Sequence, residues 1–153
     1  FSREFDYQEI LGQSNATRFL KLDNIAIRAD KNAEIEKVIL AILAAKIATQ
    51  EVTLAIDLDS NIIAEIEKIS PAILWKVDVV KGDITSFVKN INSFKRVRLV
   101  ENLSENALKE AAAPTGLTII SDEVVSLGRV ELLHYLQEQS VSNNYHRFGY
   151  IPN

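Results

Sequence analysis

The chain has 153 residues, yet it contains no cysteine, no methionine, only five glycines and only three prolines. Without cysteine the protein has no disulfide, no thiolate metal site and no cysteine nucleophile. So few glycines and prolines argue against long flexible linkers. The length suits one compact domain, or a piece of a larger protein.

Positive charge and long apolar runs are also scarce. The 17 lysines and arginines are scattered and outnumbered by 21 acidic residues, giving a net charge of −4. Because phosphate binding needs clustered positive side chains, we expect no nucleic-acid partner. No apolar run approaches the roughly 20 residues that span a bilayer, so we expect no membrane span. The start at Phe1, without a leader pattern, is typical of a processed or excised piece, and we expect a cytoplasmic location.

Short β-branched runs alternate with helical patterns along the chain. The pattern predicts extended segments at 17–22, 25–28, 52–56, 72–80, 97–100 and 117–120. It predicts helices at 35–47, 62–69, 82–91, 103–112 and 128–140. This alternation with short connections is typical of parallel βαβ units. The predicted fold is therefore α/β: a Rossmann-like three-layer sandwich with a mostly parallel sheet and a C-terminal extended flap.

Several local signals refine this prediction. Asp23-Asn24 suits a tight hairpin turn, with a strand that continues through a bend as the alternative. Asp30 is a candidate N-cap for the first helix, and Gly116 suits the end of the fourth. We expect an irregular lead-in at 1–15, the Rossmann-like domain at 16–142 and a docking flap at 143–153.

A dinucleotide site needs a glycine-rich turn between a strand and a helix. Four predicted strand-to-helix junctions, at 28–32, 57–61, 100–104 and 121–124, contain no glycine, and each carries a carboxylate. Since carboxylates repel phosphates, we expect no cofactor site in this chain. The carboxylates favour helix capping, but they leave open a metal or acid/base site at the carboxyl ends of the strands. Those residues are Asp57, Asp59, Glu101, Asp122 and Glu123.

The two histidines provide no clear catalytic pattern. His134 lies on the last predicted helix, where a polar rim is the simpler interpretation, and His146 stands beside an arginine in the tail. No Gly-x-Ser-x-Gly motif supports a catalytic triad. We therefore assign no catalytic residue and no metal ligand.

The C-terminal tail is rich in aromatic residues and carries an arginine, which are residue types enriched at interfaces. An extended segment of this composition favours pairing with an exposed sheet edge over disorder. The predicted interface residues are Tyr145, His146, Arg147, Phe148, Gly149, Tyr150 and Ile151.

Two segments carry a resemblance to a known family. The stretch from Arg129-Val130-Glu131-Leu132-Leu133 to Val141-Ser142, followed by His146-Arg147-Phe148-Gly149, resembles the carboxyl-terminal end of proline utilization A. These are bifunctional bacterial proline dehydrogenases and Δ1-pyrroline-5-carboxylate dehydrogenases. Gly12-Gln13-Ser14-Asn15 is similar to the segment that opens the last domain of the longer members.

The resemblance implies a non-catalytic, aldehyde-dehydrogenase-like domain that packs on the aldehyde dehydrogenase module and helps to cover its tunnel. FAD and NAD would bind elsewhere in the parent protein. The partners would be other domains or protomers, with a possible homo-oligomer through the flap. The alternative is a stand-alone α/β module that binds a metal or small ligand through Asp57, Glu101 and Asp122.

Overall fold

The computed structural model describes residues 3–100 and 106–145. The chain forms two compact units: one comprises Leu22–Tyr135, and the other combines Phe1–Lys21 with Leu136–Asn153. We call the first the body and the second the ribbon. The functional domain ranges that the sequence suggests, 1–15, 16–142 and 143–153, stay a prediction.

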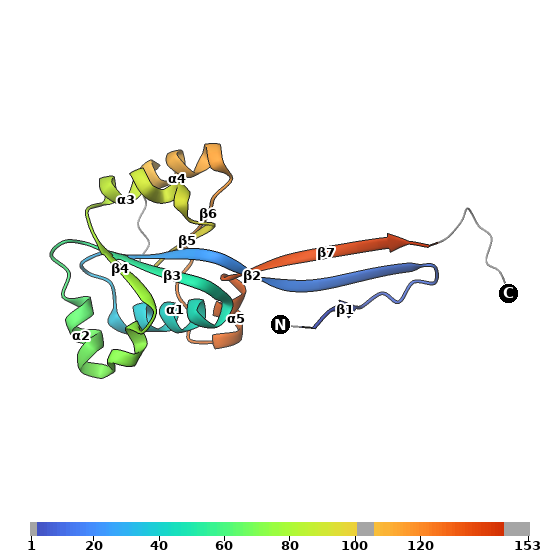
Figure 1. Cartoon of the computed structure of the whole chain (residues 1–153), viewed down its shortest axis with the longest axis horizontal. Helices are drawn as coiled ribbons and strands as arrows, with labels where there is room; N and C mark the ends of the chain where they lie inside the picture. Colours follow the sequence, from blue (N-terminus) through green and yellow to red (C-terminus); the bar gives the residue numbers. More distant parts are fainter. Residues whose placement is uncertain (1–2, 101–105, 146–153) are drawn as a thin grey trace. The chain divides into compact units, whose positions relative to one another are not determined.

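The body is built on a parallel sheet whose strand order is β4-β3-β2-β5-β6 (Figure 1). Strand β2 is long, Gln13–Ala29, and its second half belongs to the body. The others are β3 (Thr49–Ile56), β4 (Val77–Lys81), β5 (Arg96–Leu99) and β6 (Thr118–Ile120). All four pairings in this order are parallel, so the predicted α/β fold is confirmed.

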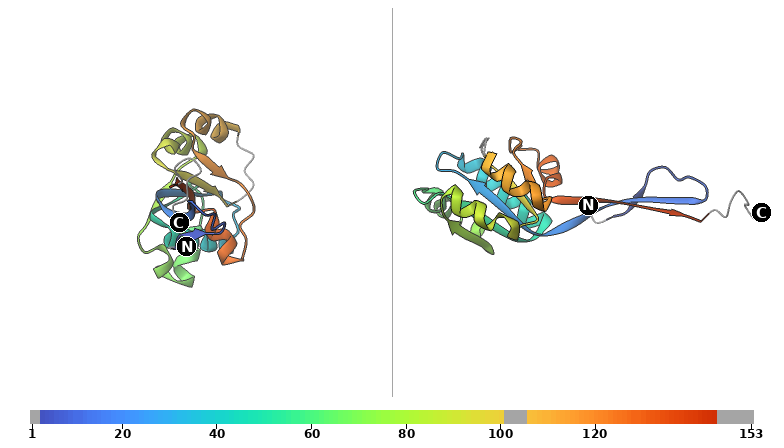
Figure 2. Two further views of the ribbon diagram at one scale, coloured as in Figure 1. Left: turned by 90° about the vertical axis from the view of Figure 1, so that its right-hand side faces the viewer. Right: turned by 90° about the horizontal axis from the view of Figure 1, so that it is seen from above.

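Helices cover both faces of this sheet and complete three layers (Figures 1 and 2). One face carries α1 (Ile35–Ala48), α2 (Ile62–Ile69) and α5 (Gly128–Leu133). The other carries α3 (Ile84–Asn90) and α4 (Asn106–Ala112). Short 3₁₀ turns follow at Pro71–Leu74, Ile91–Ser93 and Ala113–Thr115. Among the described residues, no helix is long and apolar enough to cross a bilayer.

The core forms because the central strands are apolar on both faces. Ile25 and Ile27 are fully buried on one face of β2, and Ala26 is fully buried on the other. Ala26 packs with Ala55, Phe87 and further residues of α3, β5 and α4. Burying one such isoleucine stabilises the folded state by about 1.5–3 kcal/mol. The central strands are thus buried on both faces, as the parallel sheet predicted from the sequence requires.

The largest departure from the predicted elements concerns the predicted helix at 128–140. The helix ends at Leu133, and Leu136–Asn144 forms strand β7 instead. The reason is tertiary: β7 pairs in antiparallel register with the first half of β2, from Gln13↔Asn144 to Lys21↔Leu136. Nine residue pairs outweigh the modest helix propensity of this polar segment.

The start of the chain also differs from the prediction. The prediction of a hairpin turn at Asp23-Asn24 is wrong, because β2 continues through these residues. The alternative, a strand that runs on through a bend, is the one the structure has. Asn24 instead donates from Nδ2 to the Ser93 carbonyl at 2.6 Å. The lead-in is partly ordered, because β1 (Phe5–Asp6) pairs with β2.

Of three further predictions about where elements begin and end, two are wrong and one is confirmed. Asp30 does not cap α1, because Glu34 precedes the helix and the Asp30 carboxylate accepts from the Asn32 N–H. The extended segment predicted at 72–80 starts with a 3₁₀ turn, and only β4 is strand. Gly116 does end the α4 region, with a left-handed φ of 68°.

Candidate functional site

The ribbon is an antiparallel arrangement in which β2 lies between β1 and β7. β1 adds only the pairs Phe5↔Thr17 and Asp6↔Ala16, whereas β7 pairs along nine residues. No described strand lies against the outer edge of β7. An edge strand presents unpaired N–H and C=O groups, which can accept a further strand from another chain or domain.

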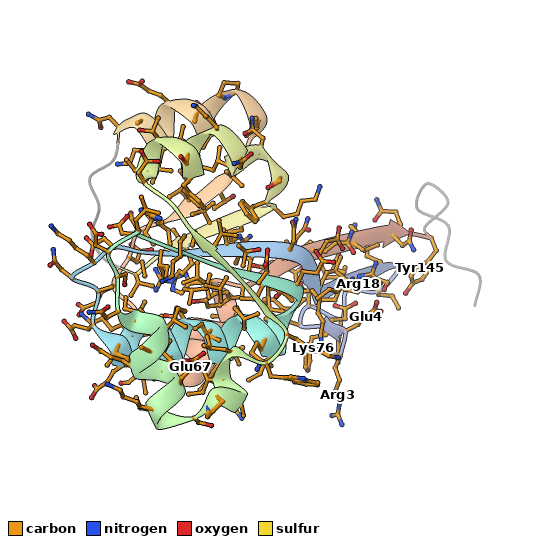
Figure 3. All side chains as sticks on the ribbon, turned by 60° about the vertical axis from the view of Figure 1, so that its left-hand side comes forward. Arg3, Glu4, Arg18, Glu67, Lys76 and Tyr145 are labelled. Atoms are coloured by element: carbon orange, nitrogen blue, oxygen red, sulfur yellow. The ribbon has the colours of Figure 1, made fainter. Side chains whose placement is uncertain are left out.

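Polar contacts hold the ribbon strands in register. Arg18 forms an ion pair with Glu4 at 2.9 Å, and the two side chains point toward one another (Figure 3). Arg18 Nε also donates to Gln139 Oε1 at 2.6 Å. Asp6 accepts backbone hydrogen bonds, the strongest from the Asn15 N–H at 2.9 Å, which lower the pKa of its carboxyl. These exposed contacts fix geometry, but they add little stability.

The ribbon exposes apolar side chains that nothing in its own unit buries. Tyr7, Leu11 and Tyr145 are all highly exposed, and Leu136 is the only apolar side chain of the described ribbon that is buried. Antiparallel ribbons of this size are marginal alone in water. The ribbon therefore has the properties of a docking element.

Of the predicted interface residues, Tyr145 is described. Its N–H donates to the Gly12 carbonyl at 3.1 Å, and its hydroxyl reaches the Gln13 carbonyl at 3.4 Å. The aromatic ring stays exposed at the end of β7, beside the first residues of β2 (Figure 3). The other predicted residues, His146, Arg147, Phe148, Gly149, Tyr150 and Ile151, lie outside the described residues.

The body carries an apolar face that the sequence patterns did not single out. On α1, Leu43 and Ile47 are exposed, and around α5 so are Leu127, Val130 and Leu133. The two helices pack together, and a hollow of about 130 Å³ between them has an almost wholly apolar lining. We call these residues the α1/α5 face. Exposed apolar side chains on two helices that pack together are candidates for an interaction surface.

The α1/α5 face arises because α1 buries one side, which includes Val38 and Ile42 as well as alanines, and leaves Leu43 and Ile47 at the surface. Ala41, Ala45 and Ala48 are buried, while Ile47 is 61% exposed. The sequence carried a signal for this, since α1 is apolar nearly all round. Such a helix has more apolar surface than one contact can bury.

Two of the carboxylates at the predicted strand-to-helix junctions form ion pairs with basic side chains. Asp57 forms an ion pair with Arg28, and Glu123 forms one with Lys37 at 3.1 Å. Glu34 also pairs with Lys37, and these two hydrogen bonds raise the pKa of the lysine. Within 3–100 and 106–145, no cluster of three acidic or histidine side chains could hold a metal ion. Glu101 lies outside these residues.

A buried polar network ties β5 to α5. Arg98 donates from Nε and Nη2 to the carboxylate of Glu131, at 2.9 and 3.1 Å, and Tyr135 donates its hydroxyl at 2.9 Å. Burial opposes the charge on Glu131, but the hydrogen bonds from Arg98, Val125 and Tyr135 leave its pKa below the ordinary value. Burial, with the Glu131 charge, raises the pKa of Tyr135. The buried polar atoms of Arg98, Glu131 and Tyr135 therefore all have hydrogen-bond partners within the described residues.

His134 lies close in sequence to this network, between Glu131 and Tyr135. It lies at the C-terminal end of α5, where its carbonyl accepts from Arg96 Nη1 at 2.6 Å. The backbone of His134 therefore has a structural role at the end of this helix, while the interpretation of its side chain as a rim position stays a prediction.

Comparison with known proteins supplies a match among the solved structures. No protein-family model matches the chain, and no curated protein is significantly similar. A solved structure, proline utilization A from Corynebacterium freiburgense, is similar with a TM-score of 0.56 and 24% sequence identity. The match covers 99% of this chain and 12% of that one.

The chain shares the fold of the matched 12% of proline utilization A from Corynebacterium freiburgense. The likeness extends over both the body and the ribbon, since it covers nearly the whole sequence. The chain spans only 12% of the similar protein, so the remaining part of that protein has no counterpart in it.

Proposed function

We propose that this chain is the non-catalytic C-terminal domain of a bifunctional enzyme that converts proline to glutamate through Δ1-pyrroline-5-carboxylate. Its role is to support assembly and to cover the aldehyde dehydrogenase module. The observation that carries the proposal is the fold shared with proline utilization A along 99% of the chain. The sequence resemblance at 129–149 and 12–15 points the same way.

A non-catalytic role agrees with the chemistry of the chain. It has no cysteine, so it lacks the thiol nucleophile of an aldehyde dehydrogenase. Among the described junctions, Asp57 and Glu123 are paired with cations, and none carries a glycine-rich turn. FAD and NAD would be held elsewhere in the parent enzyme, which we place in the cytoplasm.

Two surfaces support a role in assembly. The outer edge of β7 offers backbone groups to a further strand, and the α1/α5 face offers apolar side chains. We infer that another domain or protomer of the parent enzyme covers both. The other domains are the natural occupant, because the similar protein is far longer than this chain.

The α1/α5 face can be tested in the parent enzyme with matched substitutions. Ile47 on α1 and Ile69 on α2 are equally exposed, at 61% and 60%, but only Ile47 lines the hollow beside α5. We expect Ile47→Asp to weaken domain packing and to slow proline-to-glutamate conversion, because it places a charge in an apolar contact. Ile69→Asp should change neither. Packing is measured by limited proteolysis, and conversion by NADH formation from proline.

The ribbon is tested by truncating the parent enzyme after Ser142, which removes the predicted interface residues. We expect slower aldehyde oxidation, a longer lag before NADH appears from proline, or a changed oligomeric state. If the truncated enzyme and Ile47→Asp both match the parent in all these measurements, the proposed role is wrong.

A further inference from the structure

Strand β4 forms one outer edge of the body's sheet, beside β3 (Figure 1). The Gly82 N–H, directly after β4, donates to the Ile56 carbonyl of β3 at 2.9 Å. Because backbone N–H and C=O groups alternate in direction along a strand, those of Val79 and Lys81 point away from β3. No described strand lies on that side, so this edge can accept a further strand.

An open cavity of about 400 Å³ lies beside this edge, on the side of the sheet that carries α3. Val80 is 46% exposed and lines the cavity together with Asp78, since alternation along the strand turns both to the same side. Phe87 and Phe94 stack in the cavity wall, with ring centroids 6.1 Å apart. Strand addition takes its affinity from backbone hydrogen bonds and its specificity from pockets for alternate side chains. This cavity is such a pocket for a long apolar side chain.

The charges along β4 define what can pair with it. Asp78 and Lys81 are exposed, and neither forms an ion pair with another described residue. Lys81 ends the strand, where its long side chain also reaches the cavity. Directly opposite residues of two paired strands attract one another when their charges are opposite and repel when they are alike. An acidic residue opposite Lys81 and a basic residue opposite Asp78 therefore fit this edge.

A second copy of β4 cannot supply this charge pattern. Asp78 and Lys81 are three positions apart, so their Cα–Cβ bonds point to opposite sides of the strand. In a symmetric antiparallel pair, directly opposite residues point to the same side, so Asp78 never lies opposite Lys81 of the other copy. The edge therefore suits a segment of a different sequence.

We propose that the outer edge of β4 accepts an extended segment of a partner protein as an antiparallel strand. An antiparallel edge strand on an otherwise parallel sheet is common in folds of this class. The partner segment places an acidic residue opposite Lys81, a basic residue opposite Asp78, and a long apolar residue opposite Val80, with its side chain in the cavity. This surface is separate from the assembly role, because neither the α1/α5 face nor the ribbon contributes to it.

The test uses the 153-residue chain and two synthetic peptides of identical composition. The first, acetyl-Thr-Glu-Phe-Val-Lys-Val-Thr-amide, matches the charges of β4 when it pairs antiparallel. The second exchanges the Glu and the Lys, so that two opposite-charge pairs become two like-charge pairs. We expect the first peptide to bind with a Kd of about 1 mM and the second about tenfold more weakly. Amide NMR shifts measure both values.

Hydrogen exchange shows whether the peptide binds as an added strand. The N–H groups of Val79 and Lys81 point outward, whereas that of Val80 points toward β3. At about 5 mM of the first peptide, exchange at Val79 and Lys81 should slow about sixfold, by the factor 1 + [L]/Kd. Exchange at Val80 should stay nearly unchanged, because its N–H is already paired within the sheet.

Exchanging the two charges of β4 tests the pairing from the other side. Asp78→Lys with Lys81→Asp should reverse the preference, so that the second peptide binds about tenfold more tightly than the first. The matched control is Glu65→Lys with Lys68→Glu, an exposed pair of the same spacing on α2, which should leave the preference unchanged. Unchanged thermal unfolding shows that both variants are folded.

Four results would overturn the proposal: no saturable binding, equal affinity of the two peptides, no slowing of exchange at Val79 and Lys81, or an unreversed preference in the charge-exchanged chain. Sedimentation provides a further check. A dimer of the chain that Val79→Pro dissociates would also overturn the proposal, because a second copy would then cover this edge.

Discussion

The body and the ribbon differ in how far they bury their apolar side chains. In the body, Ile25, Ile27, Leu54 and many further apolar side chains are fully buried. In the described ribbon, Leu136 is the only apolar side chain that is buried, while Tyr7, Leu11 and Tyr145 stay exposed. The body thus has its own core, whereas the ribbon has backbone pairing with hardly any core.

The difference teaches that the two units draw their stability from different sources. The body is stabilised by burial and by the enclosed Arg98–Glu131–Tyr135 network. The ribbon is joined by strand pairing and exposed polar contacts such as Arg18–Glu4, which contribute little. A unit of the second kind needs a partner to be well ordered, which suits a docking role.

Among single substitutions, the largest effect is expected from Glu131→Leu in the body. Arg98 is fully buried, and removing its partner leaves an uncompensated charge, so the unfolding free energy should fall by about 3–5 kcal/mol. Arg18→Gln, which breaks the exposed ribbon pair, should cost less than about 1 kcal/mol. Urea unfolding measures both values.

A double variant distinguishes lost charge pairing from lost packing. Arg98→Met with Glu131→Leu removes both charges and should recover much of the stability, because apolar replacement of a buried pair is often neutral. If Glu131→Leu and Arg18→Gln cost the same, the contrast between body and ribbon is wrong.

The second prediction is a pH dependence that also separates the two units. The folded pKa of Glu131 lies below its ordinary value of 4.5, so the unfolded chain binds the proton more readily. Stability from this group is therefore present above that value and is lost as the pH falls through the folded pKa. Urea unfolding between acid and neutral pH should show the loss, and Glu131→Leu should reduce it.

Asp6 in the ribbon provides the comparison. Its pKa is also lowered, chiefly by the Asn15 N–H, but the residue is only partly buried. Asp6→Asn should alter the pH dependence of unfolding far less than Glu131→Leu does, since solvent screens exposed charges. The opposite ranking would show that ribbon contacts, rather than the buried network, control the acid response.

The body was largely predictable from the sequence, whereas of the ribbon only part of β2 was, as the extended segment at 17–22. Runs such as 52–56 and 97–100 are β-branched and bounded by turn residues, so their own composition specifies strands. Residues 136–144 have no such local signal. Their strand depends on partners 115 to 131 positions away, from Lys21↔Leu136 to Gln13↔Asn144. The bond from Ser142 Oγ to Asn15 Oδ1 is one such contact. Local reasoning therefore extended α5 too far.

The candidate sites divide in the same way. Sequence composition pointed to docking by the tail, and Tyr145 is the only one of its predicted interface residues that is described. The α1/α5 face depends instead on which side of α1 meets the sheet. Both Ile42 and Ile47 fall within the predicted helix at 35–47, yet Ile42 is buried and Ile47 is exposed. Similarly, the pairing of Arg28 with Asp57 requires the sheet register.

The smallest effect is expected from breaking β7 itself. Proline at both Ser140 and Val141 removes the N–H groups that face β2 in this part of the ribbon, whichever of the two is bonded. Because the body has its own core, its unfolding free energy should change by less than about 0.5 kcal/mol. Chemical unfolding followed through Trp75, the only tryptophan and a body residue, measures this.

The matched substitution lies in β3, where proline at Leu54 and Ala55 should unfold the body, since both residues are buried and pair with strands on either side. In the parent enzyme the ribbon variant should behave differently from the isolated chain. There the lost strand should weaken assembly although the body stays folded, because docking needs the β7 edge. A large loss of body stability from the β7 prolines would mean that the ribbon contributes to folding rather than to docking.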